Sequence, residues 1–300
     1  MTAQMQALTA DDLATLRAEG IVLKQGFFPA GQISQIRDTV LRLRPTAMGH
    51  RKPARKWLLT SPSYAFMRCL RSAIRDDLVY LSTVPQLCGF REFSRDYYAQ
   101  DVHLDHVMSI ESPRCEDPIT PWHTDANSPA EALYPPDYYT LKFFIYMNDI
   151  NAINGAFSYV RGTHRLVTLI REGIAAGKIA YCRTNFVSEL KSTLQIPEVI
   201  DYLLQQMTRV EFDAVKAAID ALEVGVDNPE DHALCGKAGT LLIFDDRGLH
   251  RGGIPRMDER SILRYNYMPT KYWRTTYTQM RYLMNMACRL LLPRTIARHW

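Results

Sequence analysis

Two short segments, far apart in the sequence, carry residue types that bind metal ions. The first contains His123 and Asp125, and the second contains His250. Residues two apart in a strand point to the same face, so His123 and Asp125 could bind one ion side by side. The imidazole of His250 would complete a set of two histidines and one carboxylate. Such a set leaves adjacent coordination positions open, as mononuclear non-haem iron(II) oxygenases require for a cosubstrate and O₂.

Two cationic side chains could hold an anionic molecule beside such an ion. Arg260, ten residues after His250, offers a planar fork of N–H donors that matches a carboxylate. Lys142 lies in the aromatic segment 139–147, where a lysine is rarely buried without a partner. It could hold a carboxylate of cosubstrate or substrate, or reach solvent from the rim along its apolar stem. The sequence leaves both roles open.

The elements that must position these residues change in character near residue 102. Before it, apolar spacing predicts helices, and Thr9 and Asp12 form a capping pair at the first of them. Pro45 and Pro85 are expected to end the next two, the second of which should span 63–84. After it, alternating and aromatic-rich segments predict strands over 102–112, 139–147, 154–160, 239–244 and 261–268. The pattern predicts an α+β fold with N-terminal helices and a double-stranded β-helix core, the cupin-like jelly roll.

Two helical regions lie outside that core. Residues 166–235 show helical periodicity between two predicted strands, so they predict a helical insertion that covers a pocket mouth or serves packing alone. A C-terminal helix over about 276–292 has one apolar side and arginines on the other. We interpret it as core-packing or dimer-forming, which leaves a homodimer open, because one such helix has only modest membrane affinity. The whole chain, 1–300, is expected to form one domain.

Composition is that of an ordinary globular chain, with 47% hydrophobic and 23% charged residues. The six cysteines are scattered and show no C-x-x-C pairing, which argues against a zinc knuckle or a disulfide scaffold and suits a reducing compartment. Asp11, Asp12 and Glu19 stand where a signal peptide would be apolar, and no run of eighteen apolar residues occurs. We therefore expect a cytoplasmic protein with no stable membrane insertion.

The net charge of +4 is unevenly distributed. Residues 271–300 contain six Lys and Arg residues and no acid, so this tail is +6 and the remainder is −2. A second basic run without an acid covers 42–56. Such runs attract phosphorylated substrates, nucleic acid or anionic lipid, although a solvated face is the commoner explanation. No RRM, KH or helix-turn-helix pattern occurs, so we expect no nucleic-acid partner.

Five further segments are distributed along most of the chain. They correspond to an N-terminal helix followed by a strand, to two internal strands and to a turn. They are residues 8–12, 19–22, 141–149, 154–157 and 160–165. With the metal-binding residues, they resemble the phytanoyl-CoA dioxygenase family of Fe(II)/2-oxoglutarate-dependent oxygenases. The resemblance thins in the insertion and in the C-terminal tail. It implies Fe(II), 2-oxoglutarate as cosubstrate and O₂, acting on a small-molecule substrate.

Carried over residue by residue, the resemblance makes His123, Asp125 and His250 the iron ligands. It makes Arg260 the partner of the distal carboxylate of 2-oxoglutarate. Arg264, four residues on and on the same strand face, competes for that role.

The resemblance also bears on the reaction, in which 2-oxoglutarate yields succinate and CO₂ while a substrate C–H bond is oxidised. Halogenating relatives replace the ligand carboxylate by a small residue, so Asp125 favours hydroxylation, or a related desaturation or ring closure. Many relatives place a hydroxyl residue two positions after the distal histidine, where this chain has Gly252. One expected cosubstrate contact is thus missing. His164 matches a turn residue and is expected to be structural. The expected substrate is a biosynthetic intermediate.

Two other interpretations use the same residues. A zinc-dependent hydrolase or isomerase on a cupin-like barrel would use the same three ligands, but it leaves Arg260 without a role and offers no evident general base. A binding module, a degenerate barrel that recognises a partner through its basic tail, would have no need for an intact ligand set.

Overall fold

The computed structural model describes residues 6–50, 54–60, 72–115, 121–125, 139–222 and 232–270. The described strands are β1 (Ile21–Lys24), β2 (Met48–His50), β3 (Arg55–Thr60), β4 (Val102–Ser112), β5 (Leu141–Tyr146), β6 (Phe157–Tyr159), β7 (Ala233–Leu234), β8 (Leu241–Asp245), β9 (His250–Gly252) and β10 (Arg260–Pro269). The described helices are α1 (Ala10–Glu19), α2 (Ala30–Leu43), the 3₁₀ helix η1 (Arg44–Thr46), α4 (Ser72–Leu87), α5 (Phe90–Tyr98), α6 (Thr163–Ala175), α7 (Val187–Thr193), α8 (Pro197–Gln206) and α9 (Arg209–Asp220).

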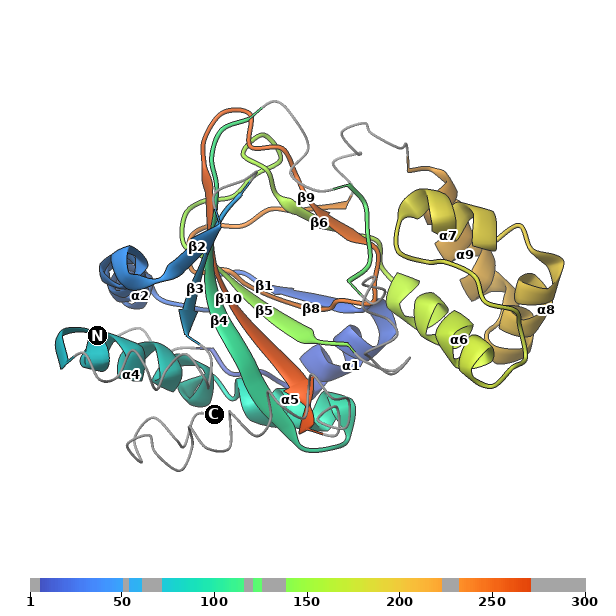
Figure 1. Ribbon diagram of the computed structural model, residues 1–300, viewed down its shortest axis with the longest axis horizontal. Helices are drawn as coiled ribbons and strands as arrows, with labels where there is room; N and C mark the ends of the chain where they lie inside the picture. The colour runs from blue at the N-terminus through green and yellow to red at the C-terminus, as the bar shows by residue number, and fades with distance from the viewer. Residues whose placement is uncertain are drawn as a thin grey trace.

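Two antiparallel sheets form the centre of the molecule (Figure 1). The larger has the strand order β1-β8-β5-β10-β4-β3-β2, and the smaller has the order β7-β6-β9. Aromatic rings from both sheets meet between them, with the centroids of Phe157 and Phe244 4.5 Å apart. This arrangement confirms the predicted α+β fold with a jelly-roll core. We call the side of the larger sheet that faces β6 and β9 the inner face.

The outer face of the larger sheet is covered by the N-terminal helices, as Figure 1 shows for α1, α4 and α5. Phe90 of α5 stacks on Phe143 of β5, with ring centroids 4.3 Å apart. Alternation along β5 explains why one strand serves two cores: Phe143 and Ile145 face the helices, whereas Lys142, Phe144 and Tyr146 share the inner face. The inner face therefore carries the residues that are available for chemistry.

Helices α6 to α9 form a lobe beside the barrel with an apolar core of its own (Figure 1). The lobe confirms helix formation in the predicted insertion, although α6 begins at Thr163, before the expected start at residue 166. Trp122, which precedes the first histidine of the ligand pattern, is buried in this core. The lobe is thus in contact with the segment that carries His123 and Asp125.

Helix ends follow local rules at α1 and break them at α4. Thr9 and Asp12 form the predicted capping box, and Gly20 ends α1 in a left-handed conformation. Pro85, in contrast, lies inside α4, so the prediction that it follows the helix end is wrong. A proline cannot donate to the carbonyl four residues earlier, Leu81, and the hydroxyl of Tyr265 donates to that carbonyl instead, at 2.9 Å.

Several sequence predictions fall on residues that the structure does not describe. The helix predicted over 63–84 is described from Ser72 onward. The C-terminal helix and the basic tail lie outside the described residues, as do residues 51–53 of the second basic run. Within the described ranges, no helix has both the length and the apolar character needed to cross a bilayer.

Candidate metal centre

His123, Asp125 and His250 lie together, with one possible ligand atom from each within 4.8 Å of the others. Main-chain pairing accounts for this. His123 and His250 exchange two hydrogen bonds, of 3.0 and 2.9 Å, and the amide of Asp125 donates to the carbonyl of Asp246 at 2.9 Å. The segment 121–125 forms two isolated bridges, both at His123, instead of the expected strand, but the predicted convergence is present. Residues 127 positions apart (250 − 123) thereby meet.

Both imidazoles expose the same nitrogen to this meeting point. The Nδ1 atom of His123 lies 2.7 Å from the carbonyl oxygen of Pro121, and that of His250 lies 2.8 Å from the carbonyl oxygen of Gly248. A carbonyl only accepts, so each Nδ1 carries the proton and each neutral ring keeps a lone pair on Nε2. The Nε2 atoms lie 3.3 and 3.7 Å from the two oxygens of Asp125. These three side chains could hold a divalent transition metal.

Lys142 contacts the carboxylate of this group. Its ammonium donates to Oδ2 of Asp125 and lies 3.4 Å from Oδ2 of Asp246. Only 4% of Lys142 is exposed, which excludes the solvent-reaching rim lysine that the sequence left open. Asp246 in turn accepts hydrogen bonds from the amide and hydroxyl of Thr140. The charges of Lys142 and Asp125 therefore balance inside the barrel, with Asp246 as a third member that the sequence analysis missed.

Burial and charge set the protonation of the group. Burial, together with the nearby His123, lowers the pKa of His250 to about 4. Burial alone would raise the pKa of Asp125, but the Lys142 ammonium and the two imidazoles bring it well below the usual range. At neutral pH this leaves His250 neutral and Asp125 ionised, which are the forms that bind metal ions.

Arg260 is the first residue of β10 and is buried. Its position explains why residue 252 is a glycine. Its guanidinium donates to the carbonyl oxygen of Gly155 and to the hydroxyl of Ser112, the latter at 3.0 Å. A Cβ atom at Gly252 would lie 2.7 Å from Nη2 of Arg260, so a side chain there would displace the guanidinium. Ser112 is directly opposite Arg260 in the β4–β10 register and places a hydroxyl beside it. No described carboxylate pairs with Arg260.

Arg264 shares the inner face with Arg260, as expected, but has different partners. One of its N–H groups donates to Nε2 of His106 at 2.8 Å and another contact reaches Sδ of Met108 at 3.4 Å. Nδ1 of His106 lies 2.7 Å from Oδ2 of Asp105. His106 and Asp105 occupy β4, beside a register shift in its pairing with β10. Arg264 thus lies on the inner face, but its guanidinium shares no hydrogen-bond partner with that of Arg260.

His164 contributes to packing at the start of α6. Its Nε2 atom lies 3.1 Å from the carbonyl oxygen of Arg17, and its ring lies against Gly20, where a Cβ would be 2.4 Å from Nδ1. Burial lowers the pKa of this imidazole. These contacts fit the structural role expected from the sequence.

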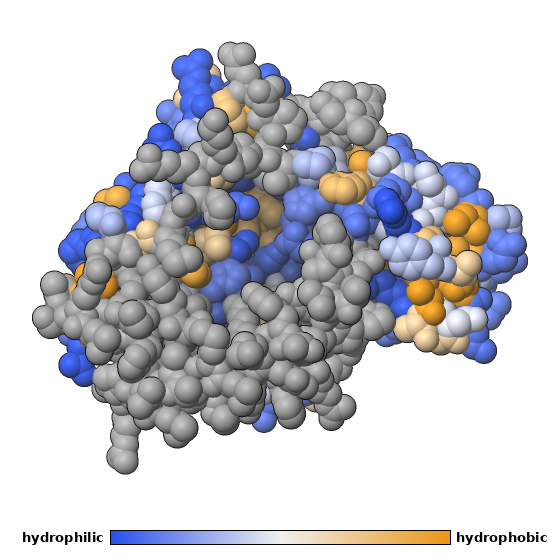
Figure 2. Space-filling view, viewed as in Figure 1, coloured by the Kyte–Doolittle hydropathy of each residue, from blue (hydrophilic) through white to orange (hydrophobic). Residues whose placement is uncertain are grey.

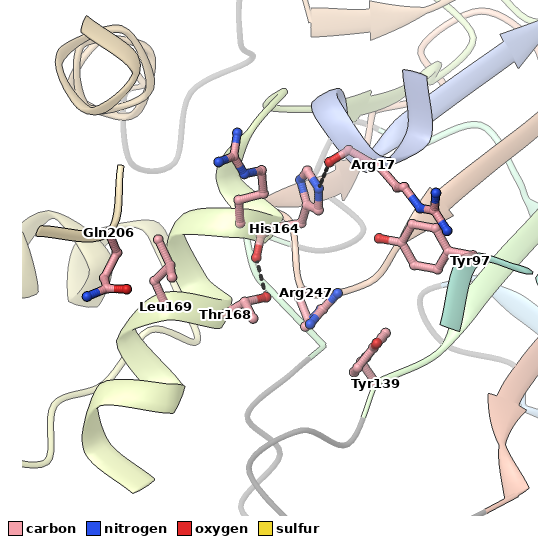
Figure 3. A pocket seen from close by; sticks show the side chains of 9 residues that line it. Arg17, Tyr97, Tyr139, His164, Thr168, Leu169, Gln206 and Arg247 are labelled. Atoms are coloured by element: carbon pink, nitrogen blue, oxygen red, sulfur yellow. Dashed lines mark hydrogen bonds between the residues drawn. The ribbon is translucent and has the colours of Figure 1, made fainter. Parts of the chain in front are cut away.

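A cavity of about 320 Å³ lies between α1, α5 and α6 (Figure 3). Tyr97, Tyr139 and Arg247 line it, and the guanidinium of Arg247 lies 3.5 Å from the ring centroid of Tyr139. Arg247 also pairs with Asp245. Asp245 contacts Tyr97 and Arg247, which line the cavity, whereas the adjacent Asp246 contacts Lys142. None of the three candidate ligands lines it.

Comparisons with known proteins agree with this geometry. The sequence model of the phytanoyl-CoA dioxygenase (PhyH) family matches residues 16–256. No curated protein sequence matches the chain. One similar solved structure is the epimerase SnoN in complex with Fe³⁺, alpha ketoglutarate and nogalamycin RO, at 13% identity and a TM-score of 0.51, covering 86% of this chain and 82% of SnoN. Another is HygX from Streptomyces hygroscopicus with nickel and 2-oxoglutarate bound, at 16% identity and a TM-score of 0.51, covering 89% of this chain and 90% of HygX. At these identities the similarity shows a shared fold.

Proposed function

The chain belongs to the phytanoyl-CoA dioxygenase family, and we propose that it hydroxylates a C–H bond of a small biosynthetic intermediate. It is an iron- and 2-oxoglutarate-dependent enzyme. The observation that carries the proposal is the convergence of two Nε2 lone pairs and one carboxylate, with both Nδ1 protons engaged by main-chain carbonyls. When bound there, iron supplies the chemistry that converts 2-oxoglutarate and O₂ to succinate and CO₂ and oxidises the substrate.

In this proposal His123, Asp125 and His250 are the iron ligands. Lys142 orients the carboxylate of Asp125, because its ammonium engages Oδ2 and leaves Oδ1 for the metal. A set of two histidines and one carboxylate would leave coordination positions available for cosubstrate and O₂. The Asp125 carboxylate also fills the position that a halide would need, which favours hydroxylation over halogenation.

Arg260 and Ser112 are proposed to hold the distal carboxylate of 2-oxoglutarate. Gly252, against which the guanidinium packs, is two residues from His250 on β9, a distance of roughly 7 Å along the strand. That spacing suits a five-carbon dicarboxylate whose other end reaches the metal. The hydroxyl of Ser112 takes the place of the hydroxyl that Gly252 lacks, since it lies beside the same guanidinium.

The test is an anaerobic titration of the iron(II)-loaded protein with 2-oxoglutarate. We expect a visible metal-to-ligand charge-transfer band, because chelation by a 2-oxo acid places a ferrous ion next to a low-lying acceptor. A zinc hydrolase or isomerase on the same ligands would show no such band. In that interpretation the buried Arg260 would also have no role.

The Asp125→Ala variant tests the ligand assignment directly. We expect it to lose at least about 100-fold in succinate formation, since removal of one ligand of a three-residue site compromises metal binding. A variant that hydroxylates at the full rate would refute the assignment.

We further propose that residues 1–300 act as one domain in the cytoplasm on a small-molecule substrate, without nucleic-acid partners. The hydrogen bonds of residues 121–125 to both the lobe and the barrel support a single domain. Sedimentation of the full chain would distinguish a monomer from a homodimer.

A further inference from the structure

The inner face carries more cationic side chains than the candidate ligands and the proposed cosubstrate would pair with. Four cationic residues lie on it or at its edge: Lys142, Arg260, Arg264 and Lys56. Lys142 is matched by Asp125 and Asp246, and Arg260 is assigned above to 2-oxoglutarate. Arg264 and Lys56 have no described carboxylate within ion-pairing distance. Figure 2 shows a hollow near the centre of the molecular face that looks between the two sheets.

Arg264 is held in one orientation by a chain of hydrogen bonds. A guanidinium only donates, so Nε2 of His106 accepts from it, and Nδ1–H of His106 then donates to Asp105. This chain uses the imidazole as a neutral connector and leaves the charge of the guanidinium uncompensated at short range. The buried Nε atom of Arg264 has no hydrogen-bond partner among the described residues. A buried donor without a partner is costly, so it indicates a place for an acceptor.

The register of the strands places Arg264 between the two functional positions already described. It is two residues from Asn266, which is opposite Lys142 on β5, and four residues from Arg260. Along the strand, the backbone of Arg264 is therefore roughly 7 Å from that of Asn266, on the side of the metal group, and roughly 13 Å from that of Arg260. The two guanidinium groups also have different partners, Gly155 and Ser112 for Arg260 and His106 and Met108 for Arg264.

Lys56 reaches the same region from β3. It is opposite Ile110 on β4, which is opposite Ile262 on β10, so its side chain leaves the sheet on the inner face. Lys56 is therefore two strands across from Arg264 and one two-residue step along the sheet. Lys56 is exposed at the edge of the inner face, and partial burial together with the charge of Arg264 lowers its pKa. Arg55, the preceding residue on the strand, leaves on the other face.

We propose that Arg264, with Lys56 beside it, binds an oxyanion of the substrate, either a carboxylate or a phosphate. The inference rests on the proposed oxygenase function and narrows it to anionic substrates. The bound oxyanion would place the rest of the substrate within one strand step of the metal group. It would accept from the Nε–H of Arg264 and add a negative charge beside two cations that have no described carboxylate within ion-pairing distance.

The first experiment separates the two arginines. Iron(II)-loaded wild type, Arg264→Gln and Arg260→Gln are titrated anaerobically with 2-oxoglutarate, followed by the charge-transfer band. We expect Arg264→Gln to keep its dissociation constant within about threefold, and Arg260→Gln to weaken binding by about tenfold or more, as loss of a charged hydrogen bond predicts. If Arg264→Gln loses 2-oxoglutarate affinity as Arg260→Gln does, Arg264 is a cosubstrate residue and the inference falls.

The second experiment measures the oxyanion itself. Inorganic phosphate and, separately, acetate are titrated calorimetrically into the anaerobic iron(II)–2-oxoglutarate complex. We expect saturable binding of one of them, weakened by about tenfold or more in Arg264→Gln and by a smaller factor in Lys56→Gln. The control variant Arg55→Gln should bind as wild type does. The anion that binds more tightly identifies the source as phosphate or carboxylate.

Equal binding of both anions by wild type and Arg264→Gln would overturn the inference while the charge-transfer band still supports an oxygenase. If the band is absent from wild type, the proposed function fails by itself. Arg264-dependent phosphate or acetate binding to such a protein would still support the oxyanion position.

Discussion

At the scale of the residue, Gly252 shows how an absent side chain makes room for Arg260, the proposed partner of 2-oxoglutarate. The guanidinium of Arg260 fills the space that a Cβ would take, and it is fixed there by Gly155 and Ser112. Sequence reasoning found the missing hydroxyl at this position but not its substitute, because Ser112 becomes a neighbour only through the β4–β10 pairing.

The Gly252→Ser variant should therefore weaken 2-oxoglutarate binding although it restores a hydroxyl. The new Cβ would push the flexible end of Arg260 out of its position, so we expect a loss of about tenfold in affinity and little loss of thermal stability. Charge-transfer titration and thermal unfolding measure the two effects. Gly31→Ser, where a Cβ meets nothing within 4 Å, is the matched control. Unchanged affinity in Gly252→Ser would contradict this account of Arg260.

His164 should make the protein less stable in mild acid. Burial holds the pKa of the folded imidazole below its ordinary value of 6.5, so below pH 6.5 the unfolded chain binds a proton that the folded chain does not. The free energy of unfolding therefore falls as the pH falls from 6.5 towards the folded pKa. Urea unfolding at pH 8 and pH 5 should show a smaller pH difference for His164→Gln than for wild type. Equal differences would show that His164 does not contribute to it.

At the scale of the element, local signals were sufficient where both partners are close in sequence. The capping box of Thr9 and Asp12 and the alternation along β5 needed only neighbouring residues. The end of α4 was mispredicted because the group that compensates Pro85 is the hydroxyl of Tyr265, 180 residues away. β3 was missed because its first two residues, Arg55 and Lys56, were interpreted as the end of a basic run. In that run Arg42 pairs with Asp77 and Arg44 with Glu111.

The α4 contact predicts a measurable coupling. Tyr265→Phe should lower the free energy of unfolding by about 1–2 kcal/mol, because the buried carbonyl of Leu81 loses its donor. Pro85→Ala supplies a helical N–H to the same carbonyl, so in the double variant the Tyr265→Phe substitution should cost less than half as much. Denaturant unfolding of the four proteins of this cycle gives the coupling energy. Strictly additive effects would show that Tyr265 does not compensate for the proline.

At the scale of the whole molecule, the metal-binding segment joins the lobe to the barrel. The amide of Val187 in the lobe donates to the carbonyl of Trp122, and the amide of Thr124 donates to the carbonyl of Asn185. On the other side His123 pairs with His250 on β9. The candidate ligands could be predicted from their residue types. The link between lobe and barrel could not, because it depends on tertiary contacts between residues far apart in the sequence.

Trp122→Ala should therefore weaken iron binding although its ring belongs to the core of the lobe. We expect a loss of about 3 kcal/mol or more in stability, as for other large buried aromatics, together with lower iron affinity. Metal titration and denaturant unfolding measure the two effects. Leu203→Ala, in the same core but on α8, is the matched control and should lose stability while its iron affinity remains. If both variants bind iron as wild type does, the lobe does not position the ligand segment.

The supports of both imidazoles are carbonyls of Pro121 and Gly248, not side chains. Every residue type has a carbonyl, so no point mutation can delete these two acceptors. Substitutions in the side chains around the centre could therefore change the substrate while each histidine keeps its Nε2 lone pair available to a metal ion. Main-chain support of the two histidines would thus allow the substrate-binding residues to diverge in evolution without loss of the metal site.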